Sequence, residues 1–308
     1  MLCSKRWVFL ILILTLTTMG RSQQPASCWS KALPSFRQKQ YPEAERQLRS
    51  CLSANPEDAP AHELLGLVFA DSGVQQSAAE QLRQALTLAA ANDNYRFNLA
   101  MFLAQSDHID AADEIAKPLL KSRPGADAFS LFGYIKLRQH QEREAADWFE
   151  KVVSEAPERS EAWYRLGFCR QSLGEFVPAI VAYRKVIALD SRNPRALLQL
   201  GKVLLLQGNY PGSESELEKS AGLDPSRAST WRYLSQSQLL AGKKEIARTS
   251  AVTAVTLGAS DPRNHHQLGL ALKGLGREAD AEREFQTMER LRTEQRMPGK
   301  PAANDDDY

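Results

Sequence analysis

The sequence repeats itself about every 34 residues, which restricts the chain to folds that are built by stacking similar pieces. One copy contains Trp163, Leu166 and Gly167, followed by a turn at Gly174 and a small residue at Ala179. The Leu-Gly step recurs along the chain as Leu65-Gly66, Leu99-Ala100, Phe132-Gly133, Leu166-Gly167, Leu200-Gly201, Leu234-Ser235 and Leu268-Gly269. A small residue follows each pair 12 positions after its second member, at Ala78, Ala112, Ala145, Ala179, Ser213, Ala247 and Ala281. Two separate marks in one register indicate an array of repeats.

The pattern within each copy predicts two short amphipathic helices that are joined by a turn. In the copy that contains Trp163, we expect a first helix over 160–172 and a second over 177–189, each with apolar residues at helical spacing. Gly174 lies between them and can adopt a positive φ, because it has no Cβ. One such helix pair cannot bury its apolar face alone, so we expect neighbouring copies to stack into a continuous core.

These residues resemble the tetratricopeptide repeat family, whose pattern is W-x-x-L-G-x-x-Y, then A-x-x-x-F, then P. The resemblance implies an all-α fold, a right-handed superhelical solenoid of about eight helix-turn-helix repeats. The first repeat lacks the Leu-Gly step, so it is either a capping repeat or outside an array that begins at residue 59. We place the repeats at residues 25–58, 59–92, 93–125, 126–159, 160–193, 194–227, 228–261 and 262–295.

The third repeat departs from the pattern in two ways. It is one residue short, the loss falling between Pro124 and Phe132, and Pro118 lies inside its second helix. Proline in a helix interior removes a backbone donor and clashes with the preceding turn, so it should break the helix there. We therefore expect an irregular step near residues 118–127, which is either drift in a non-binding repeat or a functional hinge.

The two ends of the chain differ from the array. Residues 1–22 contain the basic pair Lys5-Arg6, an apolar run over 7–18 and small residues at the end, which is typical of a cleaved secretory signal peptide. The alternative is an uncleaved segment that anchors the protein in a membrane. Residues 296–308 have no apolar periodicity, and we expect a disordered acidic tail whose three aspartates either stay solvated or dock on a basic face.

The balance of charge limits the kinds of partner. The formal net charge is +2, and removing Lys5, Arg6 and Arg21 with a signal peptide takes it to −1. A near-neutral chain argues against nucleic acid as a partner, because such binding rests on many phosphate contacts. No later segment is apolar enough for a stable membrane span. We therefore expect an exported protein, periplasmic or secreted, that is a monomer.

Three cysteines follow the expected signal peptide. Cys28 falls in the predicted first helix of the first repeat and Cys51 lies late in its second helix, both on faces predicted to point inward. An oxidising compartment favours a disulfide between them, and two reduced core cysteines are the alternative. Cys169 lies beside Phe168 in a predicted first helix, and we expect a packed thiol there.

The sequence contains no pattern that indicates catalysis or a cofactor. It has no Gly-rich phosphate loop, no G-x-S-x-G element and no H-E-x-x-H metal motif. Because the repeats account for most of the chain, we expect no enzyme activity, no metal and no cofactor. The histidines, none of which stands at metal-ligand spacing, are His62, His108, His140, His265 and His266.

The resemblance also implies where a partner would bind. In this family the first helices of the repeats line a concave groove that takes extended or helical protein segments. In this sequence that groove would be apolar and aromatic in the middle and basic toward the C-terminus. The alternative is that the aromatic residues pack between repeats and the basic residues are solvated. The candidate groove residues are Asn94, Phe97, Asn98, Met101, Tyr134, Leu137, Tyr164, Phe168, Arg195, Lys202, Arg232, Arg263, His266 and Lys273.

The expected function is a scaffold that binds other envelope or secreted proteins, with a partner that has an apolar stretch beside an acidic one. One alternative is a structural protein that self-assembles end to end through its repeats. Another is a non-catalytic accessory subunit of an envelope enzyme or a secretion complex.

Overall fold

The computed structural model describes residues 28–296, and these residues form helices joined by short turns, without strands. The expected signal peptide, and the expected tail from residue 297 onward, lie outside the described residues. Among the residues that the structure describes, no helix combines the length and the hydropathy needed to cross a membrane. The chain divides into two compact halves, an N-terminal half that ends at Ala156 and a C-terminal half that begins at Pro157.

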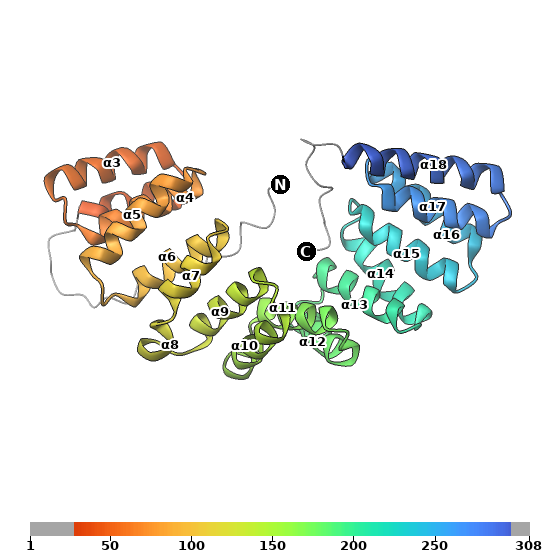
Figure 1. Cartoon of the computed structure of the whole chain (residues 1–308), viewed down its shortest axis with the longest axis horizontal. Helices are drawn as coiled ribbons and strands as arrows, with labels where there is room; N and C mark the ends of the chain where they lie inside the picture. Colours follow the sequence, from red (N-terminus) through yellow and green to blue (C-terminus); the bar gives the residue numbers. More distant parts are fainter. Residues whose placement is uncertain (1–27, 297–308) are drawn as a thin grey trace. The chain divides into compact units, whose positions relative to one another are not determined.

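Figure 1 labels the helices from α3 to α18. The elements of the N-terminal half are the 3-10 turn η2 (Cys28–Lys31) and the helices α2 (Leu33–Arg37), α3 (Tyr41–Ala54), α4 (Ala59–Asp71), α5 (Gln75–Leu88), α6 (Asp93–Gln105), α7 (Ile109–Ala116), α8 (Leu119–Ser122), α9 (Ala126–Arg138) and α10 (Glu142–Glu155). Those of the C-terminal half are α11 (Ser160–Ser172), α12 (Phe176–Leu189), α13 (Pro194–Leu206), α14 (Tyr210–Leu223), α15 (Ala228–Leu240), α16 (Lys244–Leu257), α17 (Pro262–Gly274) and α18 (Glu278–Gln295).

The helices pack as consecutive pairs within each half. In the C-terminal half α11 packs against α12, α13 against α14, α15 against α16, and α17 against α18, and each pair also contacts the next. The first helix of one pair therefore lies beside the first helix of the following pair, as α15 does beside α17. The all-α repeat solenoid that the sequence predicts is confirmed.

The turn inside each pair has one residue with a positive φ at the same place in the period. Glycine occupies this place in most pairs, including Gly174 at a φ of 74°, as the sequence predicts. Three pairs have another residue there, which shows that the packing of the two helices can impose a left-handed turn residue. The positions are Lys39, Gly73, Asp107, His140, Gly174, Gly208, Gly242 and Gly276.

From α4 onward, the two helices of a pair lie close together at the second residue of the Leu-Gly step. A Cβ added to the glycine of this step would lie 2.5–2.8 Å from the side chain that stands 16 positions later. Ala100 and Ser235 replace this glycine in two repeats, and there the later residue is alanine, Ala116 or Ala251. In each pair, a large side chain of the second helix therefore faces glycine on the first, whereas alanine of the second helix faces alanine or serine on the first. The glycine pairs are Gly66 with Leu82, Gly133 with Phe149, Gly167 with Tyr183, Gly201 with Leu217, and Gly269 with Phe285.

A side chain near the start of several first helices holds the loop that precedes it. Trp163 Nε1 donates to the carbonyl oxygen of Pro157 at 2.8 Å, six residues earlier. His62 and His265 occupy the same place in their repeats, so these two histidines have a structural role. The equivalent contacts join Trp231 to Pro225 O at 2.9 Å, His62 Nε2 to Pro56 O at 2.8 Å, and His265 Nε2 to Ala259 O at 2.9 Å.

The third repeat contains the irregular step that the sequence predicts. Its second helix is divided at Pro118, because α7 ends at Ala116 and the short α8 begins at Leu119. Gly125, with a φ of 145°, then leads directly into α9. The proline therefore breaks the helix without opening the core, since Ala116 and Leu119 on either side of it are both fully buried.

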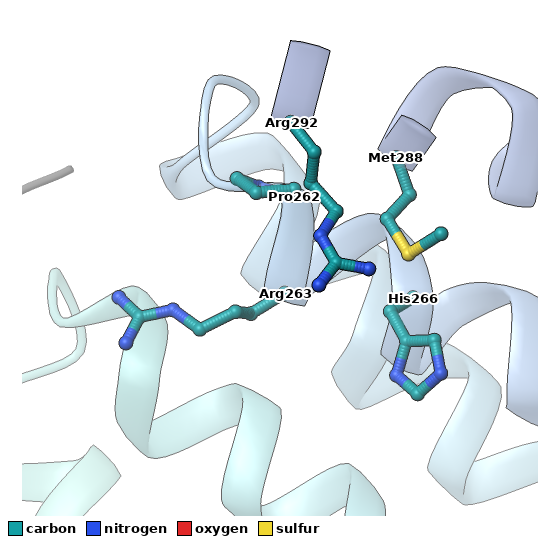
Figure 2. Close-up of a pocket in the computed structure, with 5 residues that line it drawn as sticks. All are labelled: Pro262, Arg263, His266, Met288 and Arg292. Carbon is teal, nitrogen blue, oxygen red and sulfur yellow. The ribbon is translucent and has the colours of Figure 1, made fainter. Parts of the chain in front are cut away.

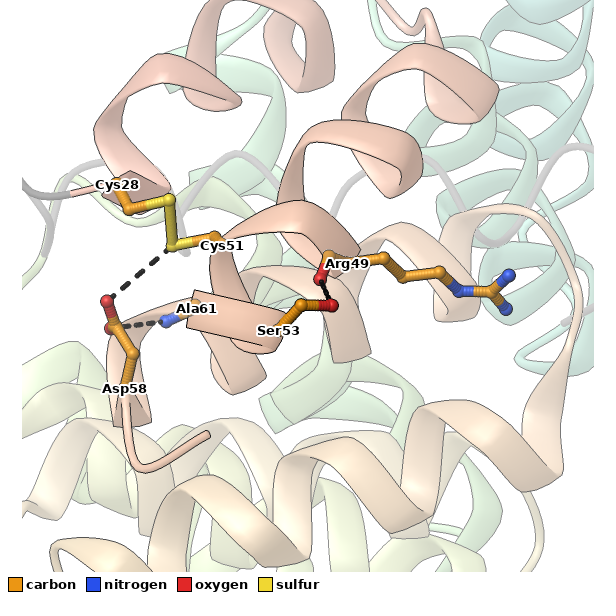
Figure 3. Close-up of a disulfide and its surroundings, with 6 residues drawn as sticks. All are labelled: Cys28, Arg49, Cys51, Ser53, Asp58 and Ala61. Carbon is orange, nitrogen blue, oxygen red and sulfur yellow. Dashed lines mark hydrogen bonds between the residues drawn. A yellow bond between two sulfur atoms is a disulfide. The ribbon is translucent and has the colours of Figure 1, made fainter. Parts of the chain in front are cut away.

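A disulfide joins Cys28 to Cys51, with their Cα atoms 5.5 Å apart, which confirms the predicted pair (Figure 3). Cys51 is buried in α3, but Cys28 is exposed, so the prediction that both cysteines point inward is wrong. The reason is local structure, because η2 and the short α2 replace the continuous first helix that was expected there. Asp58 lies next to the bridge and caps α4 by accepting a hydrogen bond from Ala61 N at 3.0 Å.

We predict that the disulfide stabilises the first repeat. Cys28→Ser should lower the free energy of unfolding by about 3 kcal/mol, because a closed loop of this length restricts the unfolded chain. The measurement is a urea titration followed by circular dichroism, with and without a reducing agent. The reductant should destabilise the wild type and leave Cys28→Ser unchanged, and equal stability of the two proteins under oxidising conditions would contradict the prediction.

Candidate functional site

The candidate groove residues of the N-terminal half lie on α6 and α9. Phe97, Met101 and Tyr134 are partly buried and pack against the core of this half. Leu137 is also partly buried. Asn94 Oδ1 accepts a hydrogen bond from Arg123 Nη1 at 2.5 Å, which holds its amide toward the end of α8. These side chains keep part of their surface exposed, but most of their area is used in packing.

Asn98 is buried and belongs to a polar contact between neighbouring first helices. Its Nδ2 atom donates to Glu63 Oε1 at 2.5 Å, and the two residues are 5 % and 4 % exposed. Burial raises the pKa of the Glu63 carboxyl to about 7, while the hydrogen bond from Asn98 acts in the opposite direction. The pair therefore joins α4 to α6 through a carboxyl group that is only partly ionised at neutral pH.

In the C-terminal half, cationic side chains lie over tyrosine rings of the first helices. The guanidinium carbon of Arg195 is 4.7 Å from the centre of the Tyr164 ring, on the preceding first helix. Lys202 Nζ of α13 lies 5.0 Å from the centre of the Tyr233 ring of α15, and the guanidinium carbon of Arg232 lies at the same distance from that ring. Cation–π contacts of this kind hold the positive groups in place.

Three candidate residues do not offer their side chains to a partner, and their assignment to the groove is wrong. Asn98, Tyr164 and Arg232 are only 5 %, 7 % and 6 % exposed. The physical reason is the same for all three, because the neighbouring first helix covers the face of the helix on which they lie. Each bonds across that contact: Asn98 to Glu63, Tyr164 Oη as acceptor from Gln199 Nε2 at 3.4 Å, and Arg232 Nη1 as donor to Asp261 Oδ2 at 3.0 Å.

The remaining basic candidates lie near the surface of α13 and α17. Arg195 and Lys202 are partly exposed on α13, and His266 and Lys273 are exposed on α17. Arg263 Nε donates to Asp261 Oδ1 at 3.0 Å. Hydrogen bonds from Arg263, together with the positive charges of Arg232 and Arg263, hold the pKa of the Asp261 carboxyl below its usual range although its burial acts against this. Phe168 is partly buried on α11.

Exposed leucines, which the groove pattern in the sequence does not indicate, accompany these cations. Leu206 at the end of α13 is 61 % exposed and Leu240 at the end of α15 is 52 % exposed, at equivalent positions of two repeats. Leu270 on α17 is 36 % exposed. Lys202 and Leu206 are four residues apart, so they share one side of α13. We call the surface formed by Arg195, Lys202, Leu206, Leu240, Leu270 and Lys273 the cation–leucine face.

Two residues that take part in these contacts, Tyr233 and Glu63, were not predicted from the sequence. Tyr233 carries no distinguishing mark, although its position beside Arg232 and near Lys202 makes it the centre of a cation–π group. Glu63 stands in a helix that is apolar on most sides, and a carboxyl in the middle of such a helix is the one signal that could have indicated its burial. Within residues 28–296, no three His, Cys, Asp or Glu side chains come together in a way that would hold a metal ion.

Comparison with known proteins gives the same class as the helix pairs. Models of the tetratricopeptide repeat match residues 35–95 and residues 160–193. The solved structure of a tetratricopeptide repeat protein from Parabacteroides merdae superposes with a TM-score of 0.60 at 18 % identity, covering 76 % of this chain and 93 % of that one. The structure of YrrB, a TPR protein described as having an unusual peptide-binding site, superposes with a TM-score of 0.50 at 16 % identity, covering 59 % of this chain and 95 % of that one.

The related curated proteins are distant and longer. The chain is 22 % identical over 219 residues to DnaJ homolog subfamily C member 3 of Gallus gallus, covering 66 % of this chain and 44 % of that protein. It is 23 % identical over 253 residues to BBSome complex member BBS4 of Bos taurus, covering 82 % and 49 %. The chain thus spans less than half the length of both relatives.

The helix pairs, their common turn and the shared volume between their helices define a repeat protein of the all-α class. With the two matched segments and the structural neighbours, the chain is a tetratricopeptide repeat protein.

We predict that Glu63 makes the stability of the protein depend on pH. The pKa of this carboxyl is about 7 in the folded protein and ordinarily 4.5. Between these pH values the folded protein keeps a proton that the unfolded chain releases, so the free energy of unfolding falls as pH rises from about 4.5 through 7. Glu63→Gln should be equal to the wild type at pH 4 and more stable by roughly 1–3 kcal/mol at pH 8. Urea unfolding at the two pH values measures the difference.

The matched control for this prediction is Glu80→Gln, which changes an exposed carboxyl on α5 of the same half. It should alter the free energy of unfolding by less than about 0.5 kcal/mol at either pH. If Glu63→Gln has the same small effect as Glu80→Gln at pH 8, the carboxyl of Glu63 is not held in its neutral form by burial.

Proposed function

We propose that this protein is a scaffold for protein–protein interaction, and that the cation–leucine face of its C-terminal half binds a segment of a partner. The family supports this, because its repeats supply a surface of parallel first helices, and YrrB is described as having a peptide-binding site. The single observation that carries the proposal is the combination of fixed cations and exposed leucines on successive first helices.

The chemistry of this face selects a partner segment with both acidic and apolar side chains. Lysine and arginine side chains that are held over tyrosine rings have lost part of their freedom before binding, so they pair with carboxylates at a smaller entropic cost. When a partner covers the exposed leucines next to them, apolar surface is removed from water and the complex is stabilised. The partner fits best as an extended or helical segment in which an apolar stretch lies beside an acidic one.

We also propose that the chain acts outside the cytosol, in the periplasm or as a secreted protein. The disulfide between Cys28 and Cys51 supports this location, because such bonds persist in oxidising compartments. The apolar run over residues 7–18, with basic residues before it, supports export by a signal peptide. The protein would act there as a monomer, without catalysis of its own.

We predict that reversing two charges of the face abolishes partner capture while the fold remains intact. Lys202→Glu with Lys273→Glu should reduce the amount of a captured protein more than about tenfold, because attraction of an acidic segment becomes repulsion. The measurement is capture from an envelope extract on the tagged chain, followed by mass spectrometry, with thermal melting of each variant as a test of folding.

The control is Arg184→Glu with Lys185→Glu, which reverses two exposed charges on the second helix α12 and gives the same change in net charge. A second pair tests the leucines, with Leu206→Ser and Leu240→Ser compared with Val177→Ser and Val181→Ser, which are exposed on α12. A protein that is retained by both controls and lost from both face variants supports the proposal. If face and control variants capture the same proteins equally, the face is not the binding surface.

A further inference from the structure

A hollow of about 260 Å³ lies between α17 and α18 in the C-terminal half. Pro262, Arg263 and His266 line it from α17, and Met288 and Arg292 line it from α18. Figure 2 shows Arg292 and Met288 extending from α18 toward His266, with Arg263 along one side. Pockets that enclose drug-sized molecules measure roughly 300–1,000 Å³. This hollow is smaller, so it suits one or two side chains of another protein.

The lining of the hollow is positively charged and partly apolar. Arg292 and His266 are exposed, and Arg292 has no ion-pair partner among residues 28–296. Arg263 Nη2 already pairs with Asp261 Oδ2 at 3.0 Å, so Arg292 is the main positive group that a ligand meets. Met288 supplies apolar surface beside it. Because guanidinium groups bind carboxylates through charge-assisted hydrogen bonds, this lining fits an acidic side chain.

The equivalent place one repeat earlier is occupied by the start of α17. Asn264, which is 0 % exposed, donates through Nδ2 to the carbonyl oxygens of Ala254 at 3.1 Å and Gly258 at 2.9 Å. Arg232 Nη1 donates to Asn264 Oδ1 at 3.2 Å and to Asp261 Oδ2 at 3.0 Å. A carboxylate and a carboxamide from the start of a helix therefore fill the place there. The positions related by a step of 34 residues are Arg232 and His266, Ala254 and Met288, and Gly258 and Arg292.

Another repeat has the same place with an apolar lining. Tyr164 and Val186 occupy the equivalent positions there. Ala196 at the start of α13, which corresponds to Asn264, belongs to one buried cluster with them. In both repeats the first turn of the following helix matches the chemistry of the lining, apolar against apolar and polar or acidic against a cation.

Within residues 28–296 no further helix follows α18 to cover the hollow. A second copy of this chain does not supply a matching one at the start of its described stack. Its elements η2 and α2 carry Lys31 and Arg37 and no acidic residue. These cations would face Arg292, and like charges repel. The charges therefore favour a helix from a different protein.

We propose that the hollow binds the acidic first turn of a helix of a partner protein, which extends the stack beyond α18. A carboxylate at the N-cap of that helix takes the place that Asp261 has in the preceding repeat, beside His266. A glutamate at its third helical position takes the place of Asn264, beside Arg292 and Met288. Acidic residues are stable at both positions of a helix, because the backbone N–H groups of its first turn have no partner within the helix.

The test is an NMR titration of the full chain, labelled with nitrogen-15 in its arginines, with a synthetic helical peptide that begins acetyl-Asp-Pro-Ala-Glu. The Nε–H resonance of Arg292, assigned by its loss in Arg292→Gln, should shift as the peptide is added. Fluorescence anisotropy of the labelled peptide gives the affinity. A peptide that begins acetyl-Asn-Pro-Ala-Gln should bind at least about tenfold more weakly, because it lacks both carboxylates.

Two variants of α18 locate the binding site. Arg292→Gln should weaken binding of the acidic peptide at least about fivefold, because it removes the guanidinium that pairs with the glutamate. The matched control is Arg290→Gln, which removes an exposed arginine of the same helix that is paired with Glu294 and does not line the hollow. It should leave the affinity unchanged. Both arginines are exposed, so thermal melting of the two variants should equal that of the wild type.

Equal affinity of the two peptides, or an Arg292 resonance that does not shift, overturns the proposal. Binding that survives Arg292→Gln and is lost from Lys202→Glu with Lys273→Glu also overturns it, because the peptide then binds the cation–leucine face. Acetate that displaces the peptide at the peptide's own concentration assigns the hollow to anions in general. A mass that rises with protein concentration in the wild type and not in Arg292→Gln assigns it to a second copy. The hollow and the cation–leucine face are tested by different variants, so the two proposals can fail separately.

Discussion

The close approach of the two helices in each pair is the contact on which the rest of the structure depends. Where the first helix has glycine, as at Gly201, the space of the missing Cβ is filled by a large side chain such as Leu217. Where the first helix has alanine or serine, as at Ala100, the facing residue shrinks to alanine, as at Ala116. The sizes of the two facing side chains are therefore complementary, as close packing of protein interiors requires.

The close packing of the helices determines which polar and charged side chains remain exposed to a partner. Successive first helices lie side by side, so a side chain such as Asn98 is covered by its neighbour and joins repeats through Glu63. Side chains one turn away, such as Lys202 and Leu206, stay at the surface and form the cation–leucine face.

The fold was predictable from the sequence because the period is a local and repeated signal. The Leu-Gly step, the turn at Gly174 and the break at Pro118 all appear where the pattern indicates them. The candidate face was only partly predictable, since one helical residue turns the side chain by about 100° and separates burial from exposure. Arg232 illustrates this, because its partners Asp261 and Asn264 lie 29 and 32 residues later in the chain and leave no mark near it in the sequence. Leu206 is exposed for the same reason, as only the packing of neighbours decides which leucines remain uncovered.

A double-mutant cycle at Gly201 and Leu217 tests the shared volume most directly. Gly201→Ala alone should destabilise the protein by about 1–3 kcal/mol because the new Cβ overlaps Leu217, and Leu217→Ala alone by about 2–5 kcal/mol. The double variant reproduces the alanine pair of Ala100 and Ala116, so its loss should be smaller than the sum of the two by at least about 1 kcal/mol. Gly222→Ala, in α14 with no atom within 4 Å of the added Cβ, is the control and should not destabilise. Strict additivity of the two substitutions in urea unfolding would contradict the account.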